Sequence, residues 1–338
     1  MKDTTLIKAL LLFTFSLSYL LAAELIEVKE NSLYPEGISY DKKSNNFLIS
    51  SISKGEIWSV NSSGESTLFT KDTTFPSTLG ILVDEKQNRL LVCIADPGVG
   101  KNSSRNTKGK LAAIAVYDLT SKEKINYFNL GALHPNIPHL ANDLTVDSKG
   151  NIYITDSFSP MIYKIDIKGN ISIFTEDINW SIKEGEFGLN GIVYHPDGYL
   201  IVAHYASHSL YKILLKNPNI HHKILFDQKD LNLNQQIISI DGLALTNKNT
   251  LSIVSNNFSP EVKGNGVYKL QSSDDWESAT ITELMETGAT FPTTLTKKGS
   301  SLYVIHAKLP ILFSGNKKPP ETFEIQKVIY EKVHHVKK

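Results

Sequence analysis

Cysteine is almost absent from this chain of 338 residues, and Cys93 is the single one. An intramolecular disulfide needs two cysteines, so none can form, and a cysteine-rich zinc site is excluded for the same reason. A chain of this length buries enough apolar surface to fold without such cross-links. Cys93 lies within the apolar stretch LLVCIAD, where a buried strand residue is expected.

Arginine is nearly as scarce, because Arg89 and Arg105 are the only two in the sequence. Lysine plus arginine and aspartate plus glutamate number 35 each, so the formal net charge at pH 7 is zero. Nucleic acids bind to strongly basic surfaces, and phosphate groups are recognised best by the bidentate guanidinium group of arginine. The composition therefore argues against a nucleic-acid partner.

Long apolar runs are also missing, apart from residues 9–21 near the start of the sequence. Lys2 and Lys8 precede this run, and Ala22 and Ala23 follow it. That order is typical of a secretory signal peptide, and the run is shorter than the about 20 residues of a membrane-spanning helix. We expect a signal peptide at 1–23 and a secreted or periplasmic protein that has no membrane contact after cleavage. Leu21 stands where a small residue is preferred before the cut, so an uncleaved anchor is the alternative.

The rest of the chain repeats a pattern of short apolar strands and polar turns. The clearest copy is NDLTVDSKGNIYITDSFSPMIYKID at 142–166, and related segments recur at intervals of roughly 50 residues. The strands are rich in Ile, Val, Leu and Tyr, while the connectors carry Gly, Asn, Asp or Lys, as hairpins do. No segment has a sustained helical period, so few helices are expected. The repeated segments open at Glu36, Leu79, Asn142, Asn190, Asp241 and Thr293.

Six units of about four strands each predict an all-β fold, a six-bladed β-propeller that forms one domain over 24–338. A fourth strand is expected at 66–70, 125–130, 171–175, 222–226 and 280–284. The last unit ends with 323–331 and has no fourth strand of its own. We expect 24–30 to supply it, so that N- and C-terminal strands together close the ring and remove exposed sheet edges.

In a propeller the first strand of each blade lines the central channel, so the six opening residues are expected to surround one mouth of it. Two of these residues are carboxylates, Glu36 and Asp241, and two are amides, Asn142 and Asn190. A hard cation such as Ca²⁺ takes six to eight oxygen ligands, and two carboxylates balance its charge. The alternative is that Asn and Asp merely favour turns. Their convergence from equivalent positions favours a divalent-metal site, with Ca²⁺ as the expected ion.

The repeat and the openings PEG at 35–37, AND at 141–143, LNG at 189–191 and IDG at 240–242 resemble the gluconolactonase/regucalcin family. That family is related to the diisopropyl-fluorophosphatase-type calcium-dependent hydrolases. The resemblance spans about residues 34–310 and implies that Glu36, Asn142, Asn190 and Asp241 hold a catalytic divalent metal. Sugar-lactonase members have an arginine two residues before the first metal-site asparagine. This chain has Leu140 there, which favours a less polar substrate.

A wider ring is expected at the ends of the second strands, and it includes His204 and His306. Either histidine could move protons or contact substrate, since imidazole titrates near neutral pH, but a hydrogen-bonded packing role is an equal alternative. Asp156 is expected to cap a turn or, alternatively, to orient a ligand. The segment 96–110 is basic and rich in glycine, and it is either a lid over the metal or a surface insertion.

The function expected from these observations is that of a divalent-metal-dependent hydrolase of a lactone, an ester or a phosphotriester-like small molecule. The metal would polarise the reacting group and bind the attacking water. Asp241 is expected to be a ligand that also accepts a proton or attacks directly, with His204 and His306 as further catalytic candidates. Two alternatives remain, a non-catalytic propeller that binds a ligand or protein on its top face and a strictosidine-synthase-like enzyme, because the fold does not decide function.

Overall fold

The computed structural model describes residues 24–229, 231, 236–259, 263–315 and 317–333. The expected signal peptide lies outside these residues. Within them almost all regular structure is β-strand, and the one α-helix is the short α1 (Leu309–Ser314). No helix in this part of the chain is long and apolar enough to cross a membrane.

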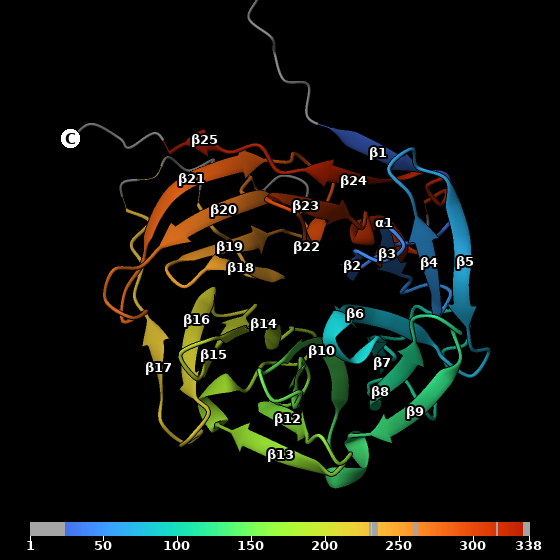
Figure 1. Ribbon diagram of the computed structural model, residues 1–338, viewed down its shortest axis with the longest axis horizontal. Coiled ribbons are helices and arrows are strands. Elements are labelled where there is room, and N and C mark those ends of the chain that lie inside the picture. Colours follow the sequence, from blue (N-terminus) through green and yellow to red (C-terminus); the bar gives the residue numbers. More distant parts are fainter. Residues whose placement is uncertain (1–23, 230, 232–235, 260–262, 316, 334–338) are drawn as a thin grey trace, which may run out of the picture.

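The strands form antiparallel sheets that are arranged around a central axis, so the fold is all-β and propeller-like (Figure 1). Most strands pair with the strand that precedes or follows them in sequence. The first two groups are β2 (Ile38–Asp41), β3 (Asn46–Ser50), β4 (Glu56–Val60) and β5 (Ser66–Lys71), followed by β6 (Ser77–Asp84), β7 (Arg89–Ala95), β8 (Lys110–Asp118) and β9 (Lys124–Asn129).

Two further groups continue around the axis. They are β10 (His139–Val146), β11 (Ile152–Asp156), β12 (Met161–Ile165) and β13 (Ile171–Glu176), then β14 (Leu189–His195), β15 (Tyr199–His204), β16 (Ser209–Leu214) and β17 (His221–Ile224). A short parallel pairing of β8 with β10 joins the groups β6–β9 and β10–β13 into one eight-stranded sheet.

The last groups involve both ends of the described chain. Strands β18 (Leu243–Asn247), β19 (Thr250–Ser255), β20 (Gly266–Gln271) and β21 (Thr280–Glu286) form one sheet, and β22 (Pro292–Lys298), β23 (Ser301–His306) and β24 (Phe323–Lys327) belong to the next. The N-terminal β1 (Leu25–Val28) pairs antiparallel with β24, as expected for 24–30. The segment 323–331 is not one strand, because its end forms β25 (Glu331–Lys332) on the outer edge of β21.

Burial follows the position of a strand within its sheet. Every residue of β11, β15 and β19 is buried, since these strands have a neighbouring sheet on each face. The outer strand β9 is almost entirely exposed. Cys93 is fully buried in β7, as the sequence indicated. The buried inner strands hold the channel-facing residues on a rigid frame.

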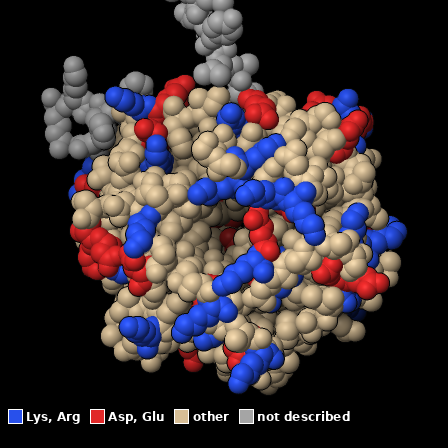
Figure 2. Space-filling view, viewed as in Figure 1, with Lys and Arg blue, Asp and Glu red and all other residues tan. Residues whose placement is uncertain are grey.

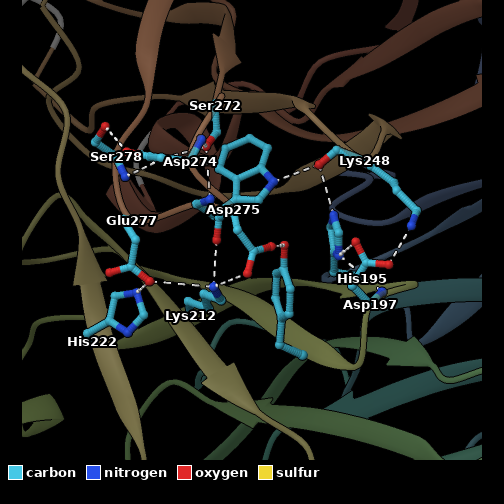
Figure 3. A network of polar contacts seen from close by, with 12 residues as sticks. His195, Asp197, Lys212, His222, Lys248, Ser272, Asp274, Asp275, Glu277 and Ser278 are labelled. Carbon is cyan, nitrogen blue, oxygen red and sulfur yellow. Dashed lines mark hydrogen bonds and ion pairs between the residues drawn. The ribbon is translucent and has the colours of Figure 1, made fainter.

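A polar network joins the sheet β14–β17 to the sheet β18–β21 (Figure 3). It includes His195, which ends β14 at the opposite end from Asn190. Lys212 Nζ on β16 is nearly buried and lies 2.8 Å from Asp275 Oδ2. The backbone oxygen of Lys248 accepts hydrogen bonds from Trp276 Nε1 at 2.7 Å and His195 Nε2 at 2.8 Å. These contacts satisfy buried polar groups and join the two sheets.

Candidate metal centre

The four expected metal-site residues lie at one end of the inner strands and line one pocket. Asn142 and Asn190 belong to β10 and β14, whereas Glu36 and Asp241 stand two residues before β2 and β18. All four are buried, with 5 or 6% of their surface exposed. The sequence argument placed these side chains together, and the structure brings them into one pocket.

Two oxygen atoms in this pocket lack a hydrogen-bond partner although they are buried. They are Glu36 Oε2 and Asn142 Oδ1. The amide nitrogen of Asn142 donates to Ser157 Oγ at 2.8 Å, and this contact orients Oδ1 away from the donor side. A buried acceptor without a partner costs free energy unless a ligand supplies the missing contact.

Asp241 is positioned by a residue that the sequence argument did not single out. Asn256 Nδ2 donates to Asp241 Oδ2 at 2.5 Å and to the backbone oxygen of Pro292 at 2.7 Å. Tyr205 in turn donates its hydroxyl to Asn256 Oδ1 at 2.6 Å. Asn256 directly follows β19, the second strand of its group, so it lies at the level where the sequence predicted a wider ring of residues.

A third carboxylate, that of Asp143, was also missed. The equivalent position after the opening residue is Gly37, Gly80, Gly191 or Gly242 in four other repeats. At Gly80 an added Cβ would lie 2.7 Å from Asp143 Oδ1, and at Gly191 it would lie 2.2 Å from the backbone oxygen of Asp241. Adjacent strands approach closely at this level, and an aspartate among these glycines was a signal in the sequence.

Glu36 and Asp241 in the pocket, and Asp143 close to them, resist ionisation when no cation is present. Burial raises the pKa of Asp241 to about 8 and that of Asp143 to about 7. Burial, followed by the negative charges of Asp241 and Asp143, raises the pKa of Glu36 well above its usual value. Like charges that cluster out of water favour the protonated forms. A divalent cation would reverse this preference.

The chemistry of these residues fits a hard divalent cation. Carboxylate and amide oxygens are the ligands that Ca²⁺ takes, and the two unpartnered oxygens belong to two of the four expected ligands. No cluster of three or more His, Cys, Asp and Glu side chains with metal-binding geometry occurs among the described residues. Two of the four expected ligands, Asn142 and Asn190, are amides, and zinc prefers nitrogen and sulfur ligands, so this set of donors disfavours zinc.

The pocket above these residues contains about 440 Å³ of space, part of it open to solvent, and has mostly apolar walls. Leu140 is among them, at the position where an arginine was expected for sugar lactones. Helix α1 contributes Leu309 and Phe313 to the wall, and in Figure 1 it lies near β2 and β22. In the same direction of view, Lys and Arg side chains border a central hollow and acidic side chains are visible inside it (Figure 2).

His204 and His306 do not line this pocket. His204 Nε2 contacts the backbone oxygen of Trp180 at 3.0 Å, and its Nδ1 accepts from the backbone of Ser207 at 3.2 Å. His306 lies between Thr290 Oγ1 at 2.7 Å and Gln326 Oε1 at 2.9 Å. Burial lowers both pKa values, to about 4 for His306. These contacts favour the packing alternative, and a catalytic role for either histidine stays a prediction.

Asp156 caps a turn, which was one of the two roles that the sequence predicted for it. Its Oδ1 accepts from the backbone nitrogens of Leu140, Phe158 and Ser159 at 2.8, 2.9 and 3.1 Å. Its Oδ2 contacts His139 Nδ1 at 2.8 Å, and this network anchors the start of β10 behind Asn142. The carboxylate thus supports the site from outside the pocket.

The segment 96–110 is folded around its first residue. Asp96 accepts from Gly98 N at 2.8 Å, Ser103 Oγ at 2.9 Å and Thr107 Oγ1 at 2.6 Å. Lys101 N donates to the backbone oxygen of Ser53 at 2.7 Å, which attaches the segment to the preceding sheet. Pro97 reaches the pocket wall. The segment is therefore part of the rim.

The fold and the pocket define a propeller-like protein with a carboxylate-amide centre at one end of its central channel. The sequence profile described as the SMP-30/Gluconolactonase/LRE-like region matches residues 34–256. Because this match covers more than half of the chain, the chain belongs to that family. No curated protein matches the sequence.

Solved structures share the fold over most of their length. The major allergen of Malassezia sympodialis is 18% identical, with a TM-score of 0.68 over 91% of this chain and 96% of the allergen. A gluconolactonase from Xanthomonas campestris is 14% identical, with a TM-score of 0.59 over 90% of each chain. The calcium-binding protein regucalcin from Agrobacterium tumefaciens is 15% identical, with a TM-score of 0.56 over 90% of this chain and 92% of its own.

Proposed function

We propose that the protein is a divalent-metal-dependent hydrolase of a lactone, an ester or a phosphotriester-like small molecule. Family membership supports lactonase-type hydrolysis. The observation that carries the proposal is the pair of unpartnered buried oxygens, Glu36 Oε2 and Asn142 Oδ1, in a pocket that also holds Asn190 and Asp241. Two such oxygens in one pocket with two further oxygen-bearing side chains form a set that a divalent cation can bind.

In this proposal Glu36, Asn142, Asn190 and Asp241 hold the metal, and Ca²⁺ is the expected ion. When bound, such an ion acts as a Lewis acid on a carbonyl or phosphoryl oxygen. Asp241 accepts the proton of the attacking water or attacks the reacting atom itself. Asn256 holds the carboxylate of Asp241 in place through its hydrogen bond to Oδ2. The apolar walls limit water near the reacting group, which strengthens the electrostatic interactions there.

The proposal includes a location and a blade count. In this proposal the ring has six blades, and β1 closes it by pairing with β24. The blades are β2–β5, β6–β9, β10–β13, β14–β17, β18–β21, and β22–β24 with β1. The predicted signal peptide at 1–23 supports export, and the mature protein would begin near Glu24. N-terminal sequencing of exported protein tests this part, since an intact Met1 on cytoplasmic protein would contradict it.

The decisive experiment combines calcium binding with a panel of generic lactones and aryl esters. We expect about one Ca²⁺ per chain by isothermal titration calorimetry and turnover that chelation abolishes and Ca²⁺ restores. Calcium binding without turnover of any compound in the panel would favour the non-catalytic ligand-binding alternative. Turnover that is unchanged in metal-free protein would contradict the proposed mechanism.

A further inference from the structure

The walls of the candidate pocket offer few hydrogen-bonding groups to the hydroxyl groups of a sugar. Apart from the four residues assigned to the metal, the lining consists of apolar or aromatic side chains. Five of them are aromatic and come from separate connections between strands: Phe187, Tyr205, Phe258, Phe291 and Phe313.

The single hydroxyl group on the wall is already occupied. Tyr205 donates its hydroxyl hydrogen to Asn256 Oδ1 at 2.6 Å, which leaves no free donor on that side chain. A polyhydroxylated ring bound here would lose its hydrogen bonds to water and gain few in return, which is unfavourable. An apolar substituent would gain from the same walls.

The aromatic side chains form a connected wall with Phe258 at its centre. The ring of Phe258 lies 4.6 Å from that of Phe291, 5.4 Å from that of Phe313 and 6.4 Å from that of Phe187, measured between centroids. The Phe258 and Phe187 rings are nearly parallel, with 11° between their planes. Rings at such distances attract one another, so the wall is organised before a substrate arrives.

The backbone of Phe291 is held in an unusual conformation. Its φ of +57° is uncommon for a bulky residue, and Pro292 follows it directly. The backbone oxygen of Phe291 accepts from the nitrogen of Ala307 at 2.9 Å, and its side chain is almost fully buried. This conformation places the ring of Phe291 in the wall, against Phe258.

A second hollow shares the lining residues Phe258 and Phe291 with the first. It contains about 1890 Å³ of space, part of it open to solvent, and its lining includes Lys263, Lys308, Lys317 and Lys318. Phe258 and Phe291 therefore form a boundary between the apolar pocket and a larger hollow that carries more charge.

We infer that this site takes substrates whose reacting carbonyl or phosphoryl group carries an alkyl or aromatic substituent, and that it discriminates against polyhydroxylated sugar-acid lactones. The inference rests on the proposed hydrolase function, whose site it uses. Phe258 and Phe313 contact the substituent and determine specificity. Both are partly exposed at the pocket, so they are available to a ligand.

Binding of lactams tests the inference without any need for turnover, since an amide in place of the ester resists hydrolysis. The calcium-loaded full chain is titrated with a δ-lactam, a heptyl-substituted δ-lactam and gluconolactam in a calorimeter. We expect the heptyl lactam to bind at least tenfold more tightly than the other two, because each buried methylene is worth about fourfold. Equal or tighter binding of gluconolactam, or no detectable binding of the heptyl lactam, would overturn the inference.

Two variants locate the discrimination. Phe258→Ala and Phe313→Ala should each reduce the affinity for the heptyl lactam by about fivefold or more while the affinity for the unsubstituted lactam stays within about twofold. Tyr127→Ala, on the exposed strand β9, is the matched control and should change neither. Calcium titration of each variant verifies that the site is folded. If both variants still prefer the heptyl lactam as the wild type does, Phe258 and Phe313 do not determine specificity.

Failure of this inference and failure of the proposed function give different results. If the wild-type protein prefers the heptyl lactam but hydrolyses no lactone or ester, the hydrolase function is wrong and the ligand class holds. If it hydrolyses gluconolactone as fast as alkyl lactones and binds the lactams equally, the function holds and the ligand class is wrong.

Discussion

Thr293 Oγ1 donates a hydrogen bond to the backbone oxygen of Glu36 at 2.7 Å, across 257 positions of sequence. Thr293 lies in β22, in the last sheet, and is fully buried, while Glu36 precedes β2 in the first. The contact joins the two ends of the propeller-like ring immediately behind a proposed metal ligand. It therefore links the stability of the ring to the geometry of the site.

The substitution Thr293→Val tests this link. Valine has the same shape but leaves the Glu36 carbonyl oxygen buried without its donor, which costs about 1–3 kcal/mol. We expect a lower melting temperature and weaker Ca²⁺ binding, measured by calorimetry. Thr67→Val on the exposed part of β5 is the control and should alter neither quantity. Loss of stability with unchanged calcium affinity would separate the ring contact from the site.

Asn256→Ala removes the amide that holds Asp241 Oδ2 and the Pro292 carbonyl oxygen. Residues that orient metal ligands typically contribute 10- to 100-fold to metal affinity, so we expect a loss of about tenfold or more. Calcium titration measures it. Asn126→Ala, on the exposed strand β9, should bind calcium like the wild type. Equal affinity in both variants would show that Asp241 needs no such support.

Asp241→Asn should abolish most turnover with little change in shape. The change removes one of two carboxylates among the four proposed ligands and any general base at this position, and positioned proton transfer alone contributes about 10²–10⁴-fold. Both kcat and Ca²⁺ affinity should fall. Asp197→Asn is the control, because Asp197 lies in the hairpin between β14 and β15, at the end of the strands remote from Asn190. Equal activity of the two variants would remove Asp241 from the mechanism.

Removal of calcium should destabilise the fold. A ligand that binds only the native state adds about 2.7 kcal/mol at a hundredfold excess over its dissociation constant. Chelation should therefore lower the melting temperature, and added Ca²⁺ should restore it. Identical melting curves for protein verified as metal-free and for calcium-loaded protein would argue against the site.

Mild acid should destabilise the protein through His306. Burial lowers the pKa of His306 from 6.5 to about 4, so the unfolded chain binds a proton at a pH where the folded protein does not. Above pH 6.5 His306 is neutral in both the folded and the unfolded state, so its burial costs no ionisation energy. As the pH falls from 6.5 to about 4, the unfolded chain takes up the proton first, and the free energy of unfolding falls by roughly 3 kcal/mol in total. His306→Gln should flatten urea-unfolding free energies over this interval. His134→Gln, whose side chain is exposed, should retain the wild-type slope.

The repeated sequence pattern determined the strands of this protein and the common level of four site residues. Alternating apolar strands and polar turns specify hairpins locally, so the strands and most of their limits could be predicted, including β1 beside the C-terminal sheet. The equivalent positions of Glu36, Asn142, Asn190 and Asp241 predicted that they share one pocket, since a repeated unit places each copy at the same level. Family resemblance follows from the same positions.

Contacts between distant segments were decided only by the tertiary structure. Asn256 reaches Asp241 because β19 ends beside the opening of β18, and no local pattern specifies that the amide donates there. His204 and His306 stand at strand ends that the sequence placed near the mouth, but their rings are taken up by neighbouring backbone and side-chain atoms. The aromatic wall joins Phe187, Phe258 and Phe313 from three connections that lie far apart in the sequence. Such groupings depend on how loops pack around the central channel, and packing is a property of the whole chain.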